Sequence, residues 1–229
     1  WEGATMKKIE LTMNDLVMQD GLYYRKFTNV PFTGKVMGQE QGTIKDGKQH
    51  GPWVRLLENG QVWTKGTIKD GKQHGPYVSY HDNGQLEYKG TFKDDKRDGP
   101  WVRYYDNGQL KKKVTYKDGV KQHGPWVHYW YSGKLMYKET FKDGKQHGRW
   151  VRYYDNGQLW SKGTFKDGKQ HGPYVRYYDN GQLEDKGTFK DDKKVGPWVG
   201  YYDNGQVVSK ATYKDGKQHG PWVRLLENG

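Results

Sequence analysis

The stretch that decides the fold runs from Trp150 to Gly172 and reads WVRYYDNGQLWSKGTFKDGKQHG. Two turn sequences, Asp-Asn-Gly and Lys-Asp-Gly, bound runs that are rich in Val, Tyr, Trp, Thr and Phe. Runs of this length and composition between turn residues are typical of β-strands. The stretch therefore predicts two strands that tight turns join into hairpins.

Close copies of this stretch follow one another along most of the chain. An aromatic residue before Val marks each copy and recurs every 24 residues, with one interval of 25. These markers are Trp53, Tyr77, Trp101, Trp126, Trp150, Tyr174, Trp198 and Trp222. A fixed period predicts an array in which each unit packs on its neighbours. We expect an all-β fold, an elongated array of antiparallel β-hairpins that forms a single-layer twisted sheet.

The chain divides into three segments by this pattern. Residues 1–13 are expected to be a tag or N-terminal extension, residues 14–42 a capping segment, and residues 43–229 about eight repeats, of which the last is incomplete. The sequence stops at Glu227-Asn228-Gly229, within a turn that has no return strand. An unpaired final strand would be a site of strand addition or self-association.

The turns predict the register of each hairpin. Asn-Gly tolerates positive φ at both positions, as a type I′ turn requires. With that turn, three pairs face one another: Tyr154 with Leu159, Arg152 with Ser161, and Trp150 with Gly163. Side chains alternate along a strand, so Trp and Arg share one face, and the other face carries Val151, Tyr153, Trp160, Lys162 and Thr164.

Two residues depart from the pattern. Val120 is one extra residue beside a turn and predicts a bulge. Glu139 takes the position of Gly163 in its repeat, beside Trp126, and the sequence offers no reason for it.

Composition limits the kind of protein. Only 32% of residues are hydrophobic, mean hydropathy is −1.19, and no run approaches the roughly 18 apolar residues of a membrane span. Without cysteine, disulfides and thiolate metal sites are excluded, and the redox compartment stays open. We expect a soluble protein, either cytoplasmic or, after removal of a signal peptide, secreted or periplasmic.

The net charge of +12 has two interpretations. It would attract acidic proteins, lipid head groups or nucleic acid. Alternatively, lysines at turns and strand positions keep a two-sided sheet soluble and discourage edge-to-edge aggregation.

The repeated Tyr-Tyr-Asp-Asn-Gly-Gln-Leu and Gly-Thr-Phe-Lys-Asp-Gly-Lys-Gln-His-Gly-Pro-Trp resemble the bacterial variant of the MORN repeat, found in YwqK-family antitoxins. The segment with Gly21-Leu22-Tyr23-Tyr24 and Pro31-Phe32-Thr33-Gly34 resembles the start of such proteins, so the resemblance covers about residues 14–229. It implies a ribbon of stacked hairpins, a non-catalytic role in binding proteins or membranes, a bacterial source and, for an antitoxin, a toxin partner.

Histidines are the first candidates for chemistry. One histidine per repeat falls in Gln-His-Gly, at His50, His74, His123, His147, His171 and His219. Two strands per repeat separate neighbouring copies by roughly 10 Å, whereas zinc ligands lie about 2 Å from one ion. Support of the turns is the favoured role, and a metal or pH-sensing role is the alternative. Calcium-loop and nucleophile motifs are absent from the sequence, and we expect no enzyme, cofactor or metal.

Two repeated surfaces are candidates for binding. Aromatic residues with arginine are typical anchors of protein interfaces. The predicted partner-binding face consists of Trp53, Arg55, Trp101, Arg103, Trp126, Trp150, Arg152, Tyr174, Arg176, Trp198, Trp222 and Arg224. Alternatively, arginine covers tryptophan within the sheet through cation-π contacts. The pairing could also stack single-stranded nucleic acid, for which the resemblance gives no support.

The opposite face carries one lysine per repeat. These predicted contacts to an anionic surface are Lys65, Lys89, Lys113, Lys138, Lys162, Lys186 and Lys210. The sequence thus leads to a non-enzymatic scaffold that binds a partner protein, with antitoxin or immunity activity as one form. Peripheral binding to anionic lipids is the alternative, and a purely structural array is a third hypothesis.

Overall fold

The computed structural model describes residues 10–121 and 124–225 and contains two compact units, residues 1–101 and 102–229. Within the described residues, the only helical element is a short 3-10 turn, η1 (Met13–Asp15). All other regular elements are strands, and neighbouring strands pair antiparallel. The predicted all-β meander of hairpins is confirmed. The turn at residues 227–229 and His123 lie outside the described residues.

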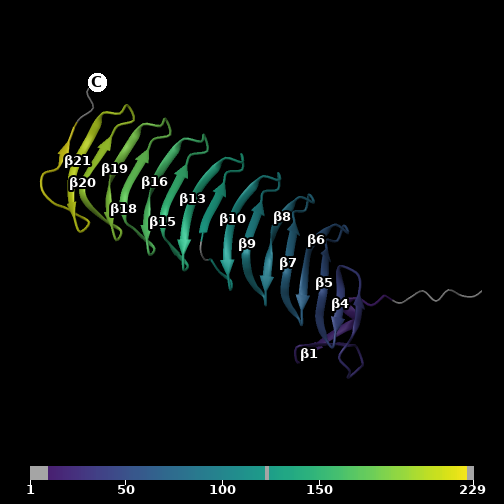
Figure 1. Ribbon diagram of the computed structural model, residues 1–229. Coiled ribbons are helices and arrows are strands. Elements are labelled where there is room, and N and C mark those ends of the chain that lie inside the picture. The colour runs from purple at the N-terminus through teal and green to yellow at the C-terminus, as the bar shows by residue number, and fades with distance from the viewer. Residues whose placement is uncertain (1–9, 122–123, 226–229) are drawn as a thin grey trace, which may run out of the picture. The chain divides into compact units, whose positions relative to one another are not determined.

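The first unit begins with a two-stranded hairpin and continues as a meander (Figure 1). Its strands are β1 (Leu16–Gln19), β2 (Leu22–Arg25), β3 (Gly34–Val36), β4 (Glu40–Lys45), β5 (Lys48–Leu56), β6 (Val62–Lys69), β7 (Lys72–Tyr80) and β8 (Leu86–Lys93). Each strand from β3 to β8 pairs with the next. The strand β9 (Lys96–Tyr104) contains the boundary between the units.

The second unit repeats the meander. Its strands are β10 (Leu110–Lys117), β11 (Val120–Lys121), β12 (Gly124–Tyr129), β13 (Leu135–Lys142), β14 (Lys145–Gln146), β15 (Gly148–Tyr153), β16 (Leu159–Lys166), β17 (Lys169–Gln170), β18 (Gly172–Tyr177), β19 (Leu183–Lys190), β20 (Lys193–Tyr201), β21 (Val207–Lys214), β22 (Lys217–Gln218) and β23 (Val223–Arg224). The two-residue strands β11, β14, β17 and β22 each pair with the same neighbour as the strand that follows them. The pair therefore acts as one interrupted strand.

The two kinds of turn differ in backbone geometry. At the Asp-Gly turn both residues have positive φ, for example 51° at Asp167 and 86° at Gly168, as a type I′ turn requires. At the Asn-Gly turn only glycine does, with φ 90° at Gly157. The Gly157 N–H donates to the Tyr154 carbonyl at 2.9 Å. The predicted type I′ geometry is therefore wrong for Asn-Gly, which fits a type I turn followed by a glycine bulge.

Asparagine has another role at this turn. The Asn156 Oδ1 accepts a hydrogen bond from the Gln158 N–H at 2.8 Å, and its Nδ2 donates to the Asp179 carbonyl of the next repeat at 3.0 Å. The same two bonds recur at Asn107 and Asn180. The side chain thus fixes its own turn and connects it to the following one, as short polar side chains do at turns.

The register follows the prediction until a bulge. Trp150 pairs with Gly163 and Arg152 with Ser161, as predicted, but Tyr153 and not Tyr154 pairs with Leu159. The register shifts there because Trp160 is an extra residue in β16, and such a bulge redirects side chains. The predicted bulge at Val120 is also wrong, because Val120 pairs regularly with Lys117.

The bulge brings two consecutive side chains to the arginine side. One repeat later, Glu184 and Asp185 both contact the same Arg176 Nη2, at 3.0 and 2.8 Å. Trp160 occupies the position of Glu184 in its own repeat and lines a groove with Arg152. Its predicted place on the lysine face is therefore wrong.

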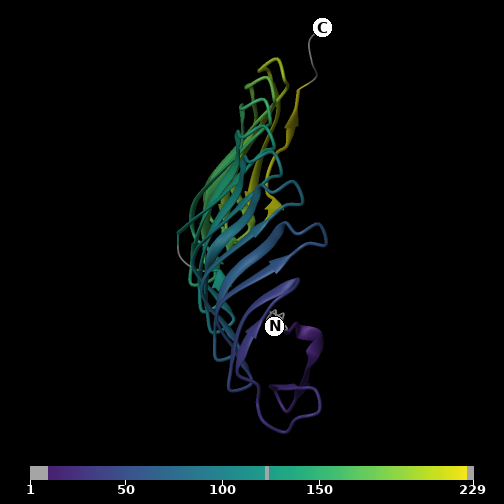
Figure 2. The same cartoon turned by 90° about the vertical axis from the view of Figure 1, so that its right-hand side faces the viewer.

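Tryptophans packed on glycines form much of the core. Trp53, Trp101, Trp150 and Trp198 are only 4–6% exposed. A Cβ added at Gly187 would lie 2.2 Å from the ring of Trp198. In the first unit, the N-terminal segment supplies a further cluster in which Leu16, Val36, Ile44 and Trp53 are buried together. Figure 2 shows this segment beside the first strands of the meander.

Candidate binding surfaces

The predicted partner-binding face, termed here the arginine face, has its tryptophans largely buried. Four of them are the core rings described above, so a rigid partner reaches little of their surface. Trp126 and Tyr174 are half-buried, whereas Trp222 is 53% exposed. The sequence identified the aromatic row, but alternation alone could not separate core rings from accessible ones.

Arginine side chains on this face cover rings or pair with acids. The Arg152 guanidinium lies 4.9 Å from the centroid of the Trp150 ring, which matches the cation-π alternative. Arg55 pairs with Glu40 at 3.6 Å. The Arg55, Arg152 and Arg176 side chains remain 38–44% exposed. Arg103 is half-buried and Arg224 is exposed in β23.

Glu139, unexplained by the sequence, has partners in the structure. Its side chain is 9% exposed, and it accepts hydrogen bonds from Gln146 Nε2 at 2.9 Å and from Arg152 Nη2 at 3.2 Å. A buried carboxylate needs such partners. Glu139 therefore fixes the side chain of Arg152, which belongs to the following repeat.

The bulge positions provide exposed tryptophans that the sequence prediction missed. Trp63 and Trp160 are 46% and 38% exposed, and each is the extra residue where the strand register shifts. A signal existed in the sequence, because these residues follow the Asn-Gly-Gln turn that sets the bulge. A pattern in which side chains alternate strictly between the two faces does not reveal this bulge.

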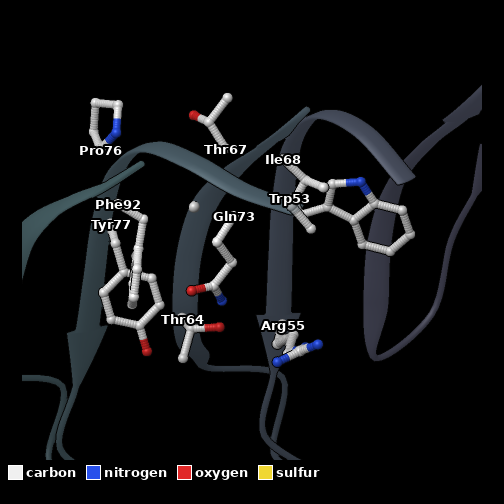
Figure 3. A pocket seen from close by; sticks show the side chains of 10 residues that line it. Trp53, Arg55, Thr64, Thr67, Ile68, Gln73, Pro76, Tyr77 and Phe92 are labelled. Atoms are coloured by element: carbon white, nitrogen blue, oxygen red, sulfur yellow. The ribbon is translucent and has the colours of Figure 1, made fainter. Parts of the chain in front are cut away.

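A groove opens beside Trp160 in the second unit. It has a volume of about 350 Å³ and is lined by Trp130, Met136, Tyr137, Glu139, Arg152, Tyr153 and Trp160. In the first unit, a cavity between β5 and β8 is much smaller, at about 30 Å³ or little more than one water, and no bulge residue lines it. Figure 3 shows Arg55, Thr64 and Tyr77 on one side of the ribbon, with Pro76 and Thr67 on the opposite side.

The lysine face forms regular rows. In the second unit the backbone pairs alternate lysine and valine from strand to strand, in the order Lys113, Val127, Lys138, Val151, Lys162, Val175, Lys186, Val199, Lys210 and Val223. The first unit has the same alternation, in the order Val54, Lys65, Val78 and Lys89. All seven predicted lysines are exposed.

Strand spacing of about 4.8 Å puts neighbouring ammonium-bearing side chains roughly 10 Å apart. Lys138, Lys162 and Arg149 also border an open groove of about 630 Å³, in which Val151 and Val175 supply apolar surface. The lysine face therefore combines evenly spaced cations with aliphatic contact area.

The histidines contact the following turn. In four repeats the histidine Nδ1 lies 3.2–3.4 Å from a carboxylate oxygen of an aspartate in the following turn. The pairs are His50 with Asp70, His74 with Asp94, His147 with Asp167 and His171 with Asp191. Each contact joins one repeat to the Asp-Gly or Asp-Asp turn of the next. In the described parts of the chain, no group of three or more His, Asp or Glu side chains is placed to hold a metal ion.

A helix that could cross a membrane is not found among the described residues.

A family model described as MORN repeat variant matches six segments, residues 73–94, 97–118, 122–143, 146–167, 170–191 and 194–215, which together exceed half of the chain. No curated protein matches the sequence.

Proposed function

Because the chain belongs to the MORN repeat variant family, whose repeats bind proteins or membranes without catalysis, we propose that it is a scaffold that binds a partner protein on its arginine face. Of the two surfaces, this face has the more specific chemistry. Its groove is lined by aromatic rings and an arginine, whereas the groove on the lysine face is bordered mainly by repeated lysine, threonine and valine side chains.

The observation that supports this proposal most is the groove beside Trp160. Its 350 Å³ can take side chains of a partner, and its walls are mostly aromatic. Trp, Tyr and Arg dominate the energetics of protein interfaces when they become desolvated. Trp160 is 38% exposed, so it has surface left to bury on binding.

Affinity capture with purified variants tests the proposal. A partner protein should be retained by the native chain and lost with Trp160→Ala, because truncation of an interface anchor costs about 2 kcal/mol or more. Lys138→Glu, on the opposite face, is the matched control and should retain the partner. Retention of every protein equally by both variants would contradict binding at this groove.

An antitoxin role is a narrower form of the proposal and has the resemblance to YwqK-family antitoxins as its support. It requires that the partner is a toxin and that one chain neutralises it. Co-expression with the captured partner should then restore growth of a bacterial host, and the Trp160→Ala variant should fail to do so.

A second candidate, peripheral attachment to an anionic membrane, is favoured by the lysine rows. Each lysine near such a surface contributes about 1 kcal/mol, so the five in the second unit amount to about 5 kcal/mol at low salt. Co-sedimentation with phosphatidylglycerol vesicles should be lost in moderate salt and absent with phosphatidylcholine. Binding to neither vesicle at low salt contradicts this candidate.

The capping role of residues 14–42 is also a proposal. Leu16 and Val36 are buried with Ile44 and Trp53 of the first repeat, which a polar chain end would leave exposed. Leu16→Ala should lower the stability of the first unit by about 2–5 kcal/mol, as measured by denaturant unfolding.

A further inference from the structure

One row of side chains crosses the second unit on the arginine face. In the order of the backbone pairs it reads Tyr137, Arg152, Ser161, Arg176, Asp185, Gly200, Ser209 and Arg224. The first strands of the hairpins supply Arg152, Arg176 and Arg224 at this position, whereas β12 supplies His128 and β20 supplies Gly200. At this one place in the row, a glycine stands where neighbouring repeats have an arginine.

The glycine lies beside the Asp185 carboxylate, of which only one oxygen has a hydrogen-bond partner. Asp185 pairs in the sheet with Arg176 on one side and Gly200 on the other. Its Oδ2 accepts a hydrogen bond from Arg176 Nη2 at 2.8 Å, whereas its Oδ1 is buried and has no hydrogen-bond partner among the described residues. Buried acceptors are rarely left unpaired, so this atom calls for a donor.

The space next to this carboxylate is a groove of about 260 Å³. Asp185, Glu184, Gly200, Ser209 and Trp222 are among the residues that line it. It is smaller than the 300–1,000 Å³ of pockets for drug-sized ligands, but a single long side chain is of the right size. Trp222 is 53% exposed and offers a ring face at the rim.

The cations already present leave this position open. The Nη2 of Arg176 already contacts the carboxylates of both Glu184 and Asp185. Lys194 lies over Trp198 and Tyr213, with Nζ 4.2 and 5.2 Å from the two ring centroids. Neither cation donates a hydrogen bond to Asp185 Oδ1, and Arg176 Nε is itself buried with no hydrogen-bond partner among the described residues.

We propose that this groove receives an arginine side chain of a partner protein, whose guanidinium completes the row at Gly200. A planar guanidinium presents several N–H donors in a fixed fork, which suits a carboxylate together with the Ser209 hydroxyl. Asp185 Oδ1 is covered in the free chain, but the Asp185 side chain as a whole is 23% exposed, so the carboxylate must turn toward the groove to accept this bond. Its flat face can stack on Trp222. This inference rests on the proposed function, because the arginine belongs to the bound protein.

Arginine binding at this groove is also expected to depend on pH. Burial raises the pKa of Glu184, with Arg176 opposing the effect. A second guanidinium nearby favours the ionised carboxylate. Arginine binding is therefore expected to weaken as the pH falls through the pKa of Glu184 and to release protons in that range.

The test is an NMR titration of the native chain with N-acetyl-arginine methylamide. Saturable shifts are expected at the Gly200 amide and the Trp222 indole, with a dissociation constant in the millimolar range. The corresponding citrulline derivative, which is neutral and similar in shape, should bind at least tenfold more weakly. Equal binding of citrulline, or shifts confined to other residues, overturns the proposal.

Variants locate the site. Asp185→Asn should weaken arginine binding about tenfold or more, and Gly200→Arg should abolish it, because the chain's own guanidinium then fills the groove. A Cβ built at Gly200 lies 2.7 Å from Ser209 Oγ and 3.2 Å from Val208 Cγ1, so the Ser209 hydroxyl must rotate and Val208 must shift slightly to admit the new side chain. Gln206→Arg adds the same charge to an exposed turn of the same hairpin and should leave binding unchanged.

The outcomes also separate this inference from the scaffold proposal. If the arginine derivative binds as expected and no partner protein is captured, the pocket stands and the scaffold role fails. If a partner is captured through Trp160 but the derivative does not bind, or Asp185→Asn has no effect, the pocket fails. Equal affinity for N-acetyl-lysine methylamide, titrated in the same way, overturns selection of a guanidinium.

Discussion

A pair of glycines at equivalent positions allows a sharp test of how tryptophan packing holds the repeats together. Gly66 and Gly187 occupy the same place in their repeats, and neither has a positive φ, so alanine strains neither backbone. They differ in what an added Cβ meets. At Gly187 it would lie 2.2 Å from Trp198, and at Gly66 it would lie 3.4 Å from Tyr77.

The two alanine variants should therefore behave in opposite ways. Gly187→Ala requires Trp198 to shift by roughly 1 Å or more, and Trp198 is only 6% exposed and packed against Tyr174 and Phe189. Overpacking of this kind costs about 1–3 kcal/mol. Gly66→Ala meets an ordinary contact and should be neutral or stabilising by up to about 1 kcal/mol, because alanine restricts the unfolded chain.

Denaturant unfolding followed by far-UV circular dichroism measures both effects. Near-UV spectra of Gly187→Ala should also report the displaced indole before the main transition. Equal loss of stability in both variants would refute the reasoning, since it would mean that the loss of glycine itself, and not the approach of Trp198, decides the cost.

Three further predictions concern the turns, the buried ion pair and an acid. Asn156→Ala removes the bonds to Gln158 and Asp179 and should cost about 1–3 kcal/mol, whereas Asn156→Asp keeps the acceptor and should cost less in the same unfolding assay. Glu139→Ala should destabilise by about 1–3 kcal/mol, seen as a lower midpoint of denaturation, because Gln146 and Arg152 lose their common acceptor. Burial raises the pKa of Glu184 above 4.5, so the folded state holds this proton more tightly than the unfolded chain. Its contribution to stability is present below that value and is lost as the pH rises through the folded pKa, and Glu184→Gln should flatten this part of a plot of Tm against pH.

Local rules explain how far the sequence could lead. The strands, the meander and the pairs of Trp150 with Gly163 and Arg152 with Ser161 follow from turn spacing and alternation. The predictions went wrong at the Asn-Gly turn, where φ is positive at glycine alone. From that point the bulge shifts Tyr153 onto Leu159 and moves Trp160 to the arginine face, which alternation cannot anticipate.

The candidate sites divide in the same way. The lysine face could be predicted because each exposed lysine follows from simple alternation within a strand. The groove beside Trp160 could not, because its lining residues come from β13, β15 and β16 together with Trp130. Glu139 is the clearest case, since its partner Arg152 is 13 residues away in sequence.

By itself, the sequence determined the 24-residue period, the positions of the strands and turns, and the separation of lysine from arginine between the two faces. These properties depend on backbone preferences and alternation within single hairpins. Tertiary packing alone fixes which tryptophans are buried, which bulge residues face Arg152 and Arg176, and which side chains line the groove beside Gly200. Each of these depends on contacts between neighbouring strands, because the space around a side chain is set by residues that the chain brings beside it only after folding.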